Sequence, residues 1–243
     1  MLRVRAVNTA ADSENKIHDD AVAAQYGFRG GLVPGVTVYG YLASAVLEHF
    51  GPEWLEHGAM DVRFREPVYE GEDLEVAAAA GADGRVQVQI GERACGVAWI
   101  GEHSPPPVAI PDALLTRKKP TADSLAPGTV FGTYIEKLDL KQSKLSAPLD
   151  PLIGGRAHPA IVIALANRIF VENYELGPWI HAGSEVRKFR SVRDGEEVRV
   201  NAKIIERYER KGHEFVVFDT VISAGTPIEF VRHTAIWRPR VSG

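Results

Sequence analysis

The sequence repeats part of itself at a separation of 124 residues, and this repeat limits the possible fold more than any other feature. Residues 59–76 (AMDVRFREPVYEGEDLEV) align without gaps with residues 183–200 (GSEVRKFRSVRDGEEVRV). Six of the 18 aligned positions are identical, whereas ordinary residue usage gives about one match by chance. The identical pairs are Val62/Val186, Arg63/Arg187, Val68/Val192, Gly71/Gly195, Glu72/Glu196 and Val76/Val200. The chain is therefore predicted to be a duplication of one folding unit.

Each predicted unit contains one long apolar segment, residues 36–50 (VTVYGYLASAVLEHF) in the first and 160–174 (AIVIALANRIFVENY) in the second. Both segments follow Gly or Pro, and both precede a Gly-Pro pair, as is typical of helix boundaries. Apolar residues nearly encircle each predicted helix, which indicates burial on several sides. We expect one core helix in each unit.

Segments typical of β-strands follow each helix, at residues 84–90 and 94–100 in the first unit and 197–208, 214–223 and 228–237 in the second. An antiparallel sheet wrapped around one central helix satisfies this order of elements. The sequence thus predicts an α+β fold built from two tandem repeats of that arrangement.

A proline-rich segment with a short basic tract separates the two predicted units. We expect an N-terminal unit at residues 1–101, a linker at 102–127 and a C-terminal unit at 128–243. The tract Arg117-Lys118-Lys119 within the linker is most simply solvated, with attraction of a phosphate as the alternative.

Composition excludes several classes of partner. The formal net charge of -4 gives no basic surface for nucleic acid. No segment approaches the roughly 18 consecutive apolar residues of a membrane span, and residues 1–5 (MLRVR) lack the apolar region of a signal peptide. A single cysteine, Cys95, excludes an internal disulfide. We expect a cytoplasmic protein with neither nucleic acid nor membrane as a partner.

The segment with the most chemical content lies before the first predicted helix. Asn15 and His18 stand three residues apart, and Pro34-Gly35 opens the long helix further along the chain. His18 is a candidate for proton transfer, and a helix N-terminus offers free N–H groups to a negatively charged oxygen. Asn15 could instead be simply the cap of the short helix that follows it. The combination is suited to chemistry on a carbonyl group.

These features together resemble the MaoC-like dehydratases, which belong to the hotdog-fold superfamily and include R-specific enoyl-CoA hydratases. The family pattern is Asp-x-Asn-Pro-aliphatic-His, followed downstream by His-Gly at the start of the central helix. Here the pattern reads Ser13-Glu14-Asn15-Lys16-Ile17-His18, and the downstream element reads Pro34-Gly35. The resemblance implies a double hotdog fold over nearly the whole chain.

The resemblance also implies roles for individual residues. His18 would be the acid and base, Asn15 would orient water or substrate, and the amide of Gly35 would bind the thioester oxygen. Pro34 has no N–H, so Val36 is the next donor, and Gly31 is a further candidate for contact with the thioester.

Three positions depart from the family pattern: Ser13 replaces the catalytic Asp, Lys16 replaces the Pro, and Pro34 replaces the His before the helix. Ser13 and Asp12 join His18 and Asn15 as candidate catalytic residues. Ser13 cannot act as a carboxylate base, so Asp12 beside it is the first candidate to replace the missing group, with Glu14 as the other. A catalytic group displaced by about an ångström can lose about a hundredfold in rate.

The second unit lacks the motif, because its corresponding segment, residues 141–147 (KQSKLSA), has no histidine. We expect chemistry in one unit only, with His158 at the second helix as a weaker candidate across the interface. The remaining histidines of the second unit, His181, His213 and His233, show no spacing of metal ligands, so no metal is expected.

Three functions follow from these expectations. The first is hydration of 2-enoyl thioesters and the reverse dehydration. The second is thioester hydrolysis or cyclisation, and the third is a non-catalytic protein that binds acyl groups or supports another hotdog subunit. The substrate would be an acyl thioester of CoA or acyl carrier protein, without a cofactor. A homodimer, or a hetero-oligomer with another hotdog subunit, is the expected assembly.

Overall fold

The structure, a computed structural model, describes residues 1–103, 109–143, 145 and 149–241. Its main sheet is antiparallel and has ten strands in the order β1-β3-β4-β5-β2-β9-β12-β11-β10-β6. The first unit supplies β1 (Leu2–Arg5), β2 (Gly58–Phe64), β3 (Asp73–Ala80), β4 (Val86–Ile90) and β5 (Ala94–Ile100). The second supplies β6 (Tyr134–Lys137), β9 (Ile180–Lys188), β10 (Glu197–Arg210), β11 (His213–Ala224) and β12 (Thr226–Arg238).

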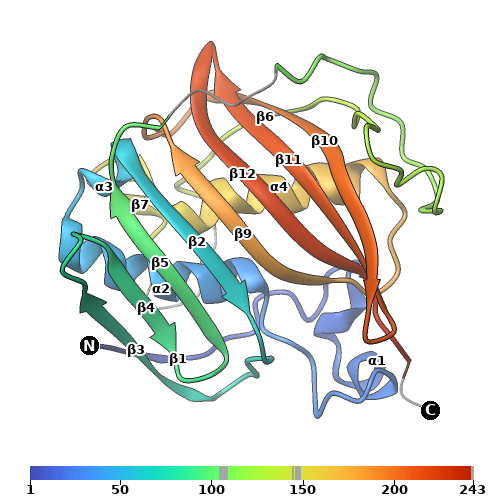
Figure 1. The fold of residues 1–243 in the computed structure, drawn as a ribbon, viewed down its shortest axis with the longest axis horizontal. Helices are drawn as coiled ribbons and strands as arrows, with labels where there is room; N and C mark the ends of the chain where they lie inside the picture. The colour runs from blue at the N-terminus through green and yellow to red at the C-terminus, as the bar shows by residue number, and fades with distance from the viewer. Residues whose placement is uncertain (104–108, 144, 146–148, 242–243) are drawn as a thin grey trace.

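The strand order reads the same from both edges once equivalent strands are matched, and β2 and β9 meet at the centre. Met60 is paired with Val186 at this junction, so the two units share one continuous sheet. Figure 1 shows both long helices on one face of it, α2 (Gly35–Phe50) behind the first unit and α4 (Pro159–Asn173) behind the second. The sheet wrapped around a central helix, present twice, is the double hotdog fold expected from the sequence.

The ends of both helices follow from local sequence. His158 caps α4 by accepting a hydrogen bond from the Ala160 amide at 3.1 Å, and Pro159 occupies the first helical position, where no intrahelical N–H bond is lost. Gly51 ends α2 with φ of 71°, a left-handed conformation that glycine adopts without strain.

The two helices touch each other closely at Gly40 of α2. A Cβ atom at this position would lie 2.6 Å from Leu149 Cδ1 and 3.1 Å from Ala160 Cβ. Only a residue without a side chain permits this approach. The predicted burial of both helices is confirmed, because the buried residues of α2 and α4 belong to one continuous apolar core.

The duplication is visible in hydrogen bonds as well as in sequence. The Val33 amide donates to Val68 O at 2.8 Å, and the Ala157 amide donates to Val192 O at the same distance. Both residues of the second pair lie 124 positions after those of the first. The segments that lead into α2 and α4 are therefore held by equivalent contacts.

Five short elements complete the described chain. They are η1 (Lys16–His18), α1 (Asp20–Gln25), α3 (Trp54–His57), β7 (Leu152–Ile153) and β8 (Arg156–Ala157). No helix among the described residues has the length and apolar character needed to cross a membrane.

The described part of the predicted linker packs against the end of α4. The Lys118 amide donates to Asn173 O at 3.0 Å, and Leu125 is fully buried. Arg117 and Lys118 are exposed at their charged ends, where Arg117 pairs with Glu14 and Lys118 lies over the Tyr174 ring. The Pro105–Pro107 run lies outside the described residues, and the unit boundaries at 101/102 and 127/128 remain predictions.

Candidate active site

A cavity of about 210 Å³ lies where η1, the start of α2, the end of β2 and the start of β9 meet. Both units contribute to it, since β2 belongs to the first and β9 to the second. Its wall is mainly apolar, and includes Ile17, Phe28, Leu32, Val38, Phe64 and Trp179. The polar groups described below are therefore set in a largely apolar wall, where electrostatic interactions are stronger than in bulk water.

His18 lies in this wall and its protonation state is set by one backbone contact. Its Nδ1 is 2.6 Å from Leu32 O, and a carbonyl oxygen can only accept, so Nδ1 carries the proton. Burial lowers the pKa of His18, opposed by the bond to Leu32. The ring is therefore neutral near pH 7, with Nε2 unprotonated and its lone pair within reach of the Asn15 Nδ2 donor at 3.3 Å.

Asn15 fixes both the His18 ring and the contact between the two units. Its Oδ1 accepts from the Trp179 amide at 3.1 Å, and its Nδ2 donates to Trp179 O at 2.9 Å. The same Nδ2 lies 3.3 Å from His18 Nε2. Oδ1 also accepts from the Ile17 amide, so Asn15 is the cap of η1 as well. Its expected role toward water or substrate stays a prediction.

The N-terminus of α2 opens onto the cavity at Gly35. Pro34 O accepts from the Thr37 and Val38 amides, and among the described backbone contacts the amides of Gly35 and Val36 have no acceptor. Their N–H groups and the positive end of the helix favour a negatively charged oxygen here. Gly35 is part of the cavity wall, and Val36 is not.

The carboxylates that the sequence offered beside Ser13 do not line this cavity in the described chain. Asp12 is exposed. Glu14 is exposed too and pairs with Arg117 at 2.6 Å, a contact that lowers its pKa. Ser13 donates to Asn15 O at 3.3 Å and so supports the motif backbone. The expected catalytic roles of Asp12 and Ser13 remain predictions without support from this geometry.

Gly31 holds the His18 segment in place and is outside the cavity wall. Its amide donates to Asp20 Oδ1 at 2.7 Å, and any Cβ there would collide with His18 O. The N–H that the sequence offered to a thioester is therefore already engaged. Asp19 caps α1 through the Val22 amide at 2.9 Å, so both acids have the structural roles that suit the first turn of a helix.

Two cavity residues were not assigned to the site from sequence. His181, at the start of β9, is 5% exposed and packs on Gly35, where a Cβ would lie 2.8 Å from its Nδ1. Glu66, which follows β2, is the one carboxylate among the described lining residues and is exposed. Neither has a local motif, and only the pairing of β2 with β9 brings His181 to the first helix.

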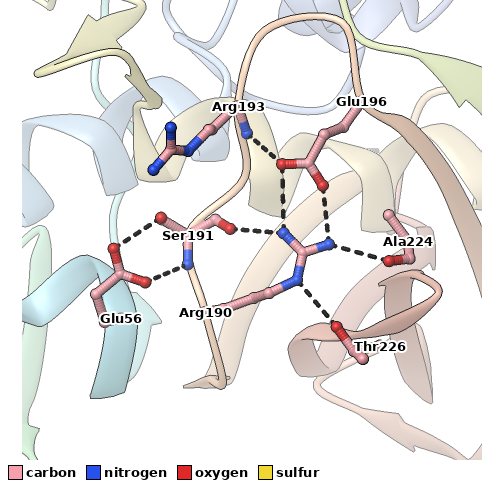
Figure 2. A network of polar contacts seen from close by, with 7 residues as sticks. All are labelled: Glu56, Arg190, Ser191, Arg193, Glu196, Ala224 and Thr226. Atoms are coloured by element: carbon pink, nitrogen blue, oxygen red, sulfur yellow. Dashed lines mark hydrogen bonds and ion pairs between the residues drawn. The ribbon is translucent and has the colours of Figure 1, made fainter.

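The equivalent position in the second unit is filled by polar side chains (Figure 2). Leu32 and Pro67 of the cavity wall correspond to Arg156 and Ser191, which lie 124 positions later. Ile180 of the wall corresponds to Glu56, which lies 124 positions earlier. The Glu56 carboxylate accepts from Arg156 Nε and Ser191 Oγ at 2.8 Å each, and from the Ser191 amide at 2.9 Å.

This polar network extends to the turn before β10. Arg190 is bonded to Glu196 at 2.8 Å, to Ala224 O at 3.1 Å and to Thr226 Oγ1 at 3.1 Å (Figure 2). The same shift relates His18 to Gln142, which is exposed. Within residues 141–147, the segment without histidine, residues 144, 146 and 147 lie outside the described residues.

His158 belongs to this second unit and is absent from the cavity wall as described. Its Nδ1 caps α4, and its Nε2 lies 3.2 Å from Ser44 Oγ on α2. Burial lowers its pKa to about 4. Among the described residues, His, Cys, Asp and Glu side chains form no group of three or more that could hold a metal ion.

Comparisons with known proteins agree on the fold. No protein-family model matches the sequence, and no curated protein matches it. A MaoC domain protein from Chloroflexus aurantiacus, described provisionally as a dehydratase, superposes with a TM-score of 0.63 at 11% identity, over 99% of this chain and 94% of its own. RV0216 from Mycobacterium tuberculosis, reported as a double hotdog fold, gives 0.56 at 13% identity, over 97% and 93%.

A third similar structure, from Lactobacillus plantarum, is described provisionally as an oleoyl thioesterase. It superposes with a TM-score of 0.55 at 11% identity, over 98% of this chain and 96% of its own. These likenesses confirm the double hotdog fold. They include two kinds of chemistry on this fold, so the reaction has to be argued from the site.

Proposed function

We propose that this protein catalyses the reversible addition of water to 2-enoyl thioesters, as a MaoC-like hydratase or dehydratase. One observation carries the proposal: the Leu32 carbonyl holds His18 with Nε2 unprotonated, in an apolar cavity that also contains the open N-terminus of α2. A base and an oxyanion site in one largely apolar pocket are what this reaction needs.

In hydration, His18 Nε2 takes a proton from water while the water oxygen bonds to the β-carbon of the substrate. The π electrons of the double bond shift toward the α-carbon, and negative charge develops on the thioester oxygen. The Gly35 amide donates to this oxygen. Protonated His18 then returns its proton to the α-carbon, which restores the enzyme and leaves the net addition of one water. Dehydration follows the same steps in reverse.

Asn15 has a positioning role in this scheme. Its Nδ2 lies 3.3 Å from His18 Nε2 and also donates to Trp179 O, so it limits rotation of the imidazole. The apolar wall would take the acyl chain, with the carrier, CoA or acyl carrier protein, outside the cavity. A homodimer or a complex with another hotdog subunit remains our expectation for the assembly.

Thioester hydrolysis is the second candidate, because the described cavity wall has no buried carboxylate to act together with His18. The one carboxylate in that wall belongs to Glu66, which is exposed. A lone neutral imidazole can activate water toward a carbonyl carbon, and the thiolate that leaves then takes up the proton. The same helix N-terminus would bind the oxyanion. Cyclisation of an acyl thioester is a further variant of this second candidate.

The test is turnover of crotonyl-CoA, followed at the enone absorbance, in parallel with thiol release from crotonyl-CoA and butyryl-CoA. We expect loss of enone absorbance without thiol release, and a drop of at least about a hundredfold in His18→Ala. His49→Ala, an exposed substitution in the last turn of α2, is the control and should keep full activity. Thiol release dependent on His18 would favour hydrolysis, and unchanged turnover in His18→Ala would refute both. No turnover by the native chain would favour the acyl-binding or partner role.

A further inference from the structure

Three polar side chains of the second unit form a buried chain behind the cavity. His181 Nε2 lies 2.8 Å from Ser184 Oγ, and Ser184 Oγ lies 3.2 Å from His233 Nδ1. The two imidazoles stack with their centroids 4.0 Å apart. His181 is 5% exposed and His233 is 0% exposed, so this group is built into the core between β9 and β12.

One ring nitrogen at each end of this chain makes no hydrogen bond within the described residues. These atoms are His181 Nδ1 and His233 Nε2. His181 Nδ1 belongs to a residue of the cavity wall and lies against Gly35, the first residue of α2. His233 Nε2 lies deep in the core, with Phe218 and Trp179 as its aromatic neighbours. Burial lowers the pKa of both rings, opposed at His181 by a contact with the Gly183 backbone, so both rings are neutral and carry one proton each.

The single hydroxyl proton of Ser184 allows two arrangements of the ring protons. In one, Ser184 donates to His181 Nε2 and accepts from His233 Nδ1–H, which leaves the His181 proton on Nδ1, a buried atom packed against Gly35 at the cavity wall. In the other, every donor is reversed, and an N–H at His233 Nε2 is buried without an acceptor. Within the described residues each arrangement leaves one ring N–H without an acceptor, at His181 Nδ1 in the first and at His233 Nε2 in the second. An orphaned buried N–H is costly. A bound substrate can accept from His181, which lines the cavity, whereas His233 is fully buried in the core, so the first arrangement is the one that a substrate oxygen favours.

We infer that His181 donates a hydrogen bond from Nδ1 to the thioester oxygen of the substrate, beside the Gly35 amide. The inference rests on the proposed function in that it takes the thioester oxygen to bind at the N-terminus of α2. Two donors from two units then stabilise the charge that develops on this oxygen. Ser184 and His233 are positioning residues, because they hold His181 in the tautomer that donates toward the cavity.

The ring tautomers can be measured directly, without any activity. Long-range ¹H–¹⁵N correlation NMR of the full chain, with His181→Asn and His233→Asn for assignment, distinguishes a protonated Nδ1 from a protonated Nε2. We expect both His181 and His233 to carry the proton on Nδ1. A proton on His181 Nε2 would overturn the inference, whatever reaction the enzyme catalyses.

Two substitutions of similar polarity test the donor by kinetics. The amide of His181→Asn reaches the position of Nδ1, whereas that of His181→Gln reaches the position of Nε2. We expect His181→Gln to lower kcat about 10²- to 10³-fold with KM little changed, and His181→Asn to stay within about tenfold of the native chain. Thermal unfolding of each variant checks the fold.

Equal kcat losses in Asn and Gln variants that remain folded, or no loss in either, would overturn the inference. If neither variant folds, the tautomer measurement decides, with His181 assigned through His233→Asn and through contacts between the two stacked rings. Absence of turnover by the native chain would refute the proposed function alone, since the tautomers are still measurable. If the native chain instead releases thiol, the same comparison is made on hydrolysis, which also develops an oxyanion.

Discussion

The side-chain amide of Asn15 forms a pair of hydrogen bonds with the backbone of Trp179, as acceptor at 3.1 Å and donor at 2.9 Å. This pair attaches the segment of the first unit that carries Asn15 and His18 to Trp179, the residue before β9 in the second. Trp179 is two residues from His181, so the same contact sets the position of His18 relative to His181. The site therefore depends on the junction of the units.

Substitution of Asn15 should affect stability and catalysis together. In Asn15→Ala, the Trp179 amide and carbonyl lose their partners, and the free energy of unfolding should fall by about 1 to 3 kcal/mol. Removal of the contact to His18 Nε2 should also lower kcat. Urea denaturation and crotonyl-CoA turnover measure the two effects. Asn8→Ala is a control that removes a contact to His18 O and leaves the Trp179 pair intact. Equal stability of native and Asn15→Ala chains would contradict this prediction.

The rate of the proposed reaction should depend on pH through His18. The neutral form of His18 is the base, so kcat/KM should be maximal at high pH. It should fall as the pH drops through the pKa of His18 in the folded enzyme. Burial places that pKa below the usual 6.5. We expect kcat/KM to be nearly constant from pH 7 to 8, with the half-maximum below 6.5. A half-maximum at or above 6.5 would show that burial does not control this histidine.

Stability should decrease in mild acid because His158 is buried and neutral. Its pKa is about 4 in the folded protein and about 6.5 when unfolded, so the unfolded chain binds more protons between these values. The stabilising effect is complete above about pH 6.5 and is lost progressively as the pH falls to about 4. For His158 alone, the free energy of unfolding falls by about 3 kcal/mol over this pH range.

Asn is a good helix cap that does not titrate, so His158→Asn isolates this effect. Chemical denaturation at several pH values should show a shallower decrease of the unfolding free energy for His158→Asn than for the native chain. Parallel curves would mean that His158 does not contribute to the acid sensitivity.

The contact between the two long helices should be sensitive to a single methyl group. Gly40→Ala places Cβ 2.6 Å from Leu149 Cδ1 and 3.1 Å from Ala160 Cβ, so the helices must separate or repack. We expect a loss of about 1 to 3 kcal/mol, in spite of the better helix propensity of Ala. Gly177→Ala is the control, because a Cβ there meets nothing within 4 Å. Thermal unfolding of both variants measures the difference, and equal midpoints would contradict the prediction.

The polar network around Glu56 in the second unit should contribute to the free energy of unfolding and not to kcat. Glu56→Gln removes the charge that holds Arg156 and Ser191, and we expect a loss of about 1 to 3 kcal/mol with kcat unchanged. Glu53→Gln, one turn earlier and exposed, is the matched control. A Glu56→Gln variant with lowered kcat and native stability would show that the two positions are coupled.

Sequence patterns predicted the two long helices and the strands β4, β5, β10, β11 and β12 because these signals are local. The strands β2, β3 and β9 were not predicted as strands. The segments 94–100 and 214–223 coincide with β5 and β11 to within one residue at each end. The short edge strands β1 and β6 were not predicted, since four residues are too few to show a periodicity. The repeat showed that two units exist. It did not show that β2 and β9 join them into one sheet.

The same distinction explains the site. Asn15, His18 and Gly35 were found because they lie close together in sequence beside a helix start, and all three line the cavity. His181 was considered only as a metal ligand, because its position beside Gly35 depends on strand pairing across 146 residues of chain. Gly31 was a candidate for contact with the thioester, whereas its amide donates to Asp20 Oδ1.

The continuous sheet through β2 and β9 also has a consequence for how the protein could change during evolution. In a symmetric pair of identical chains, every substitution occurs in both sites at once, so each position must remain compatible with the reaction. A fused chain keeps its two units in fixed proportion while allowing them to diverge. The Glu56 network occupies the place of a second cavity, which a dimer of identical subunits could not have given up without losing the first.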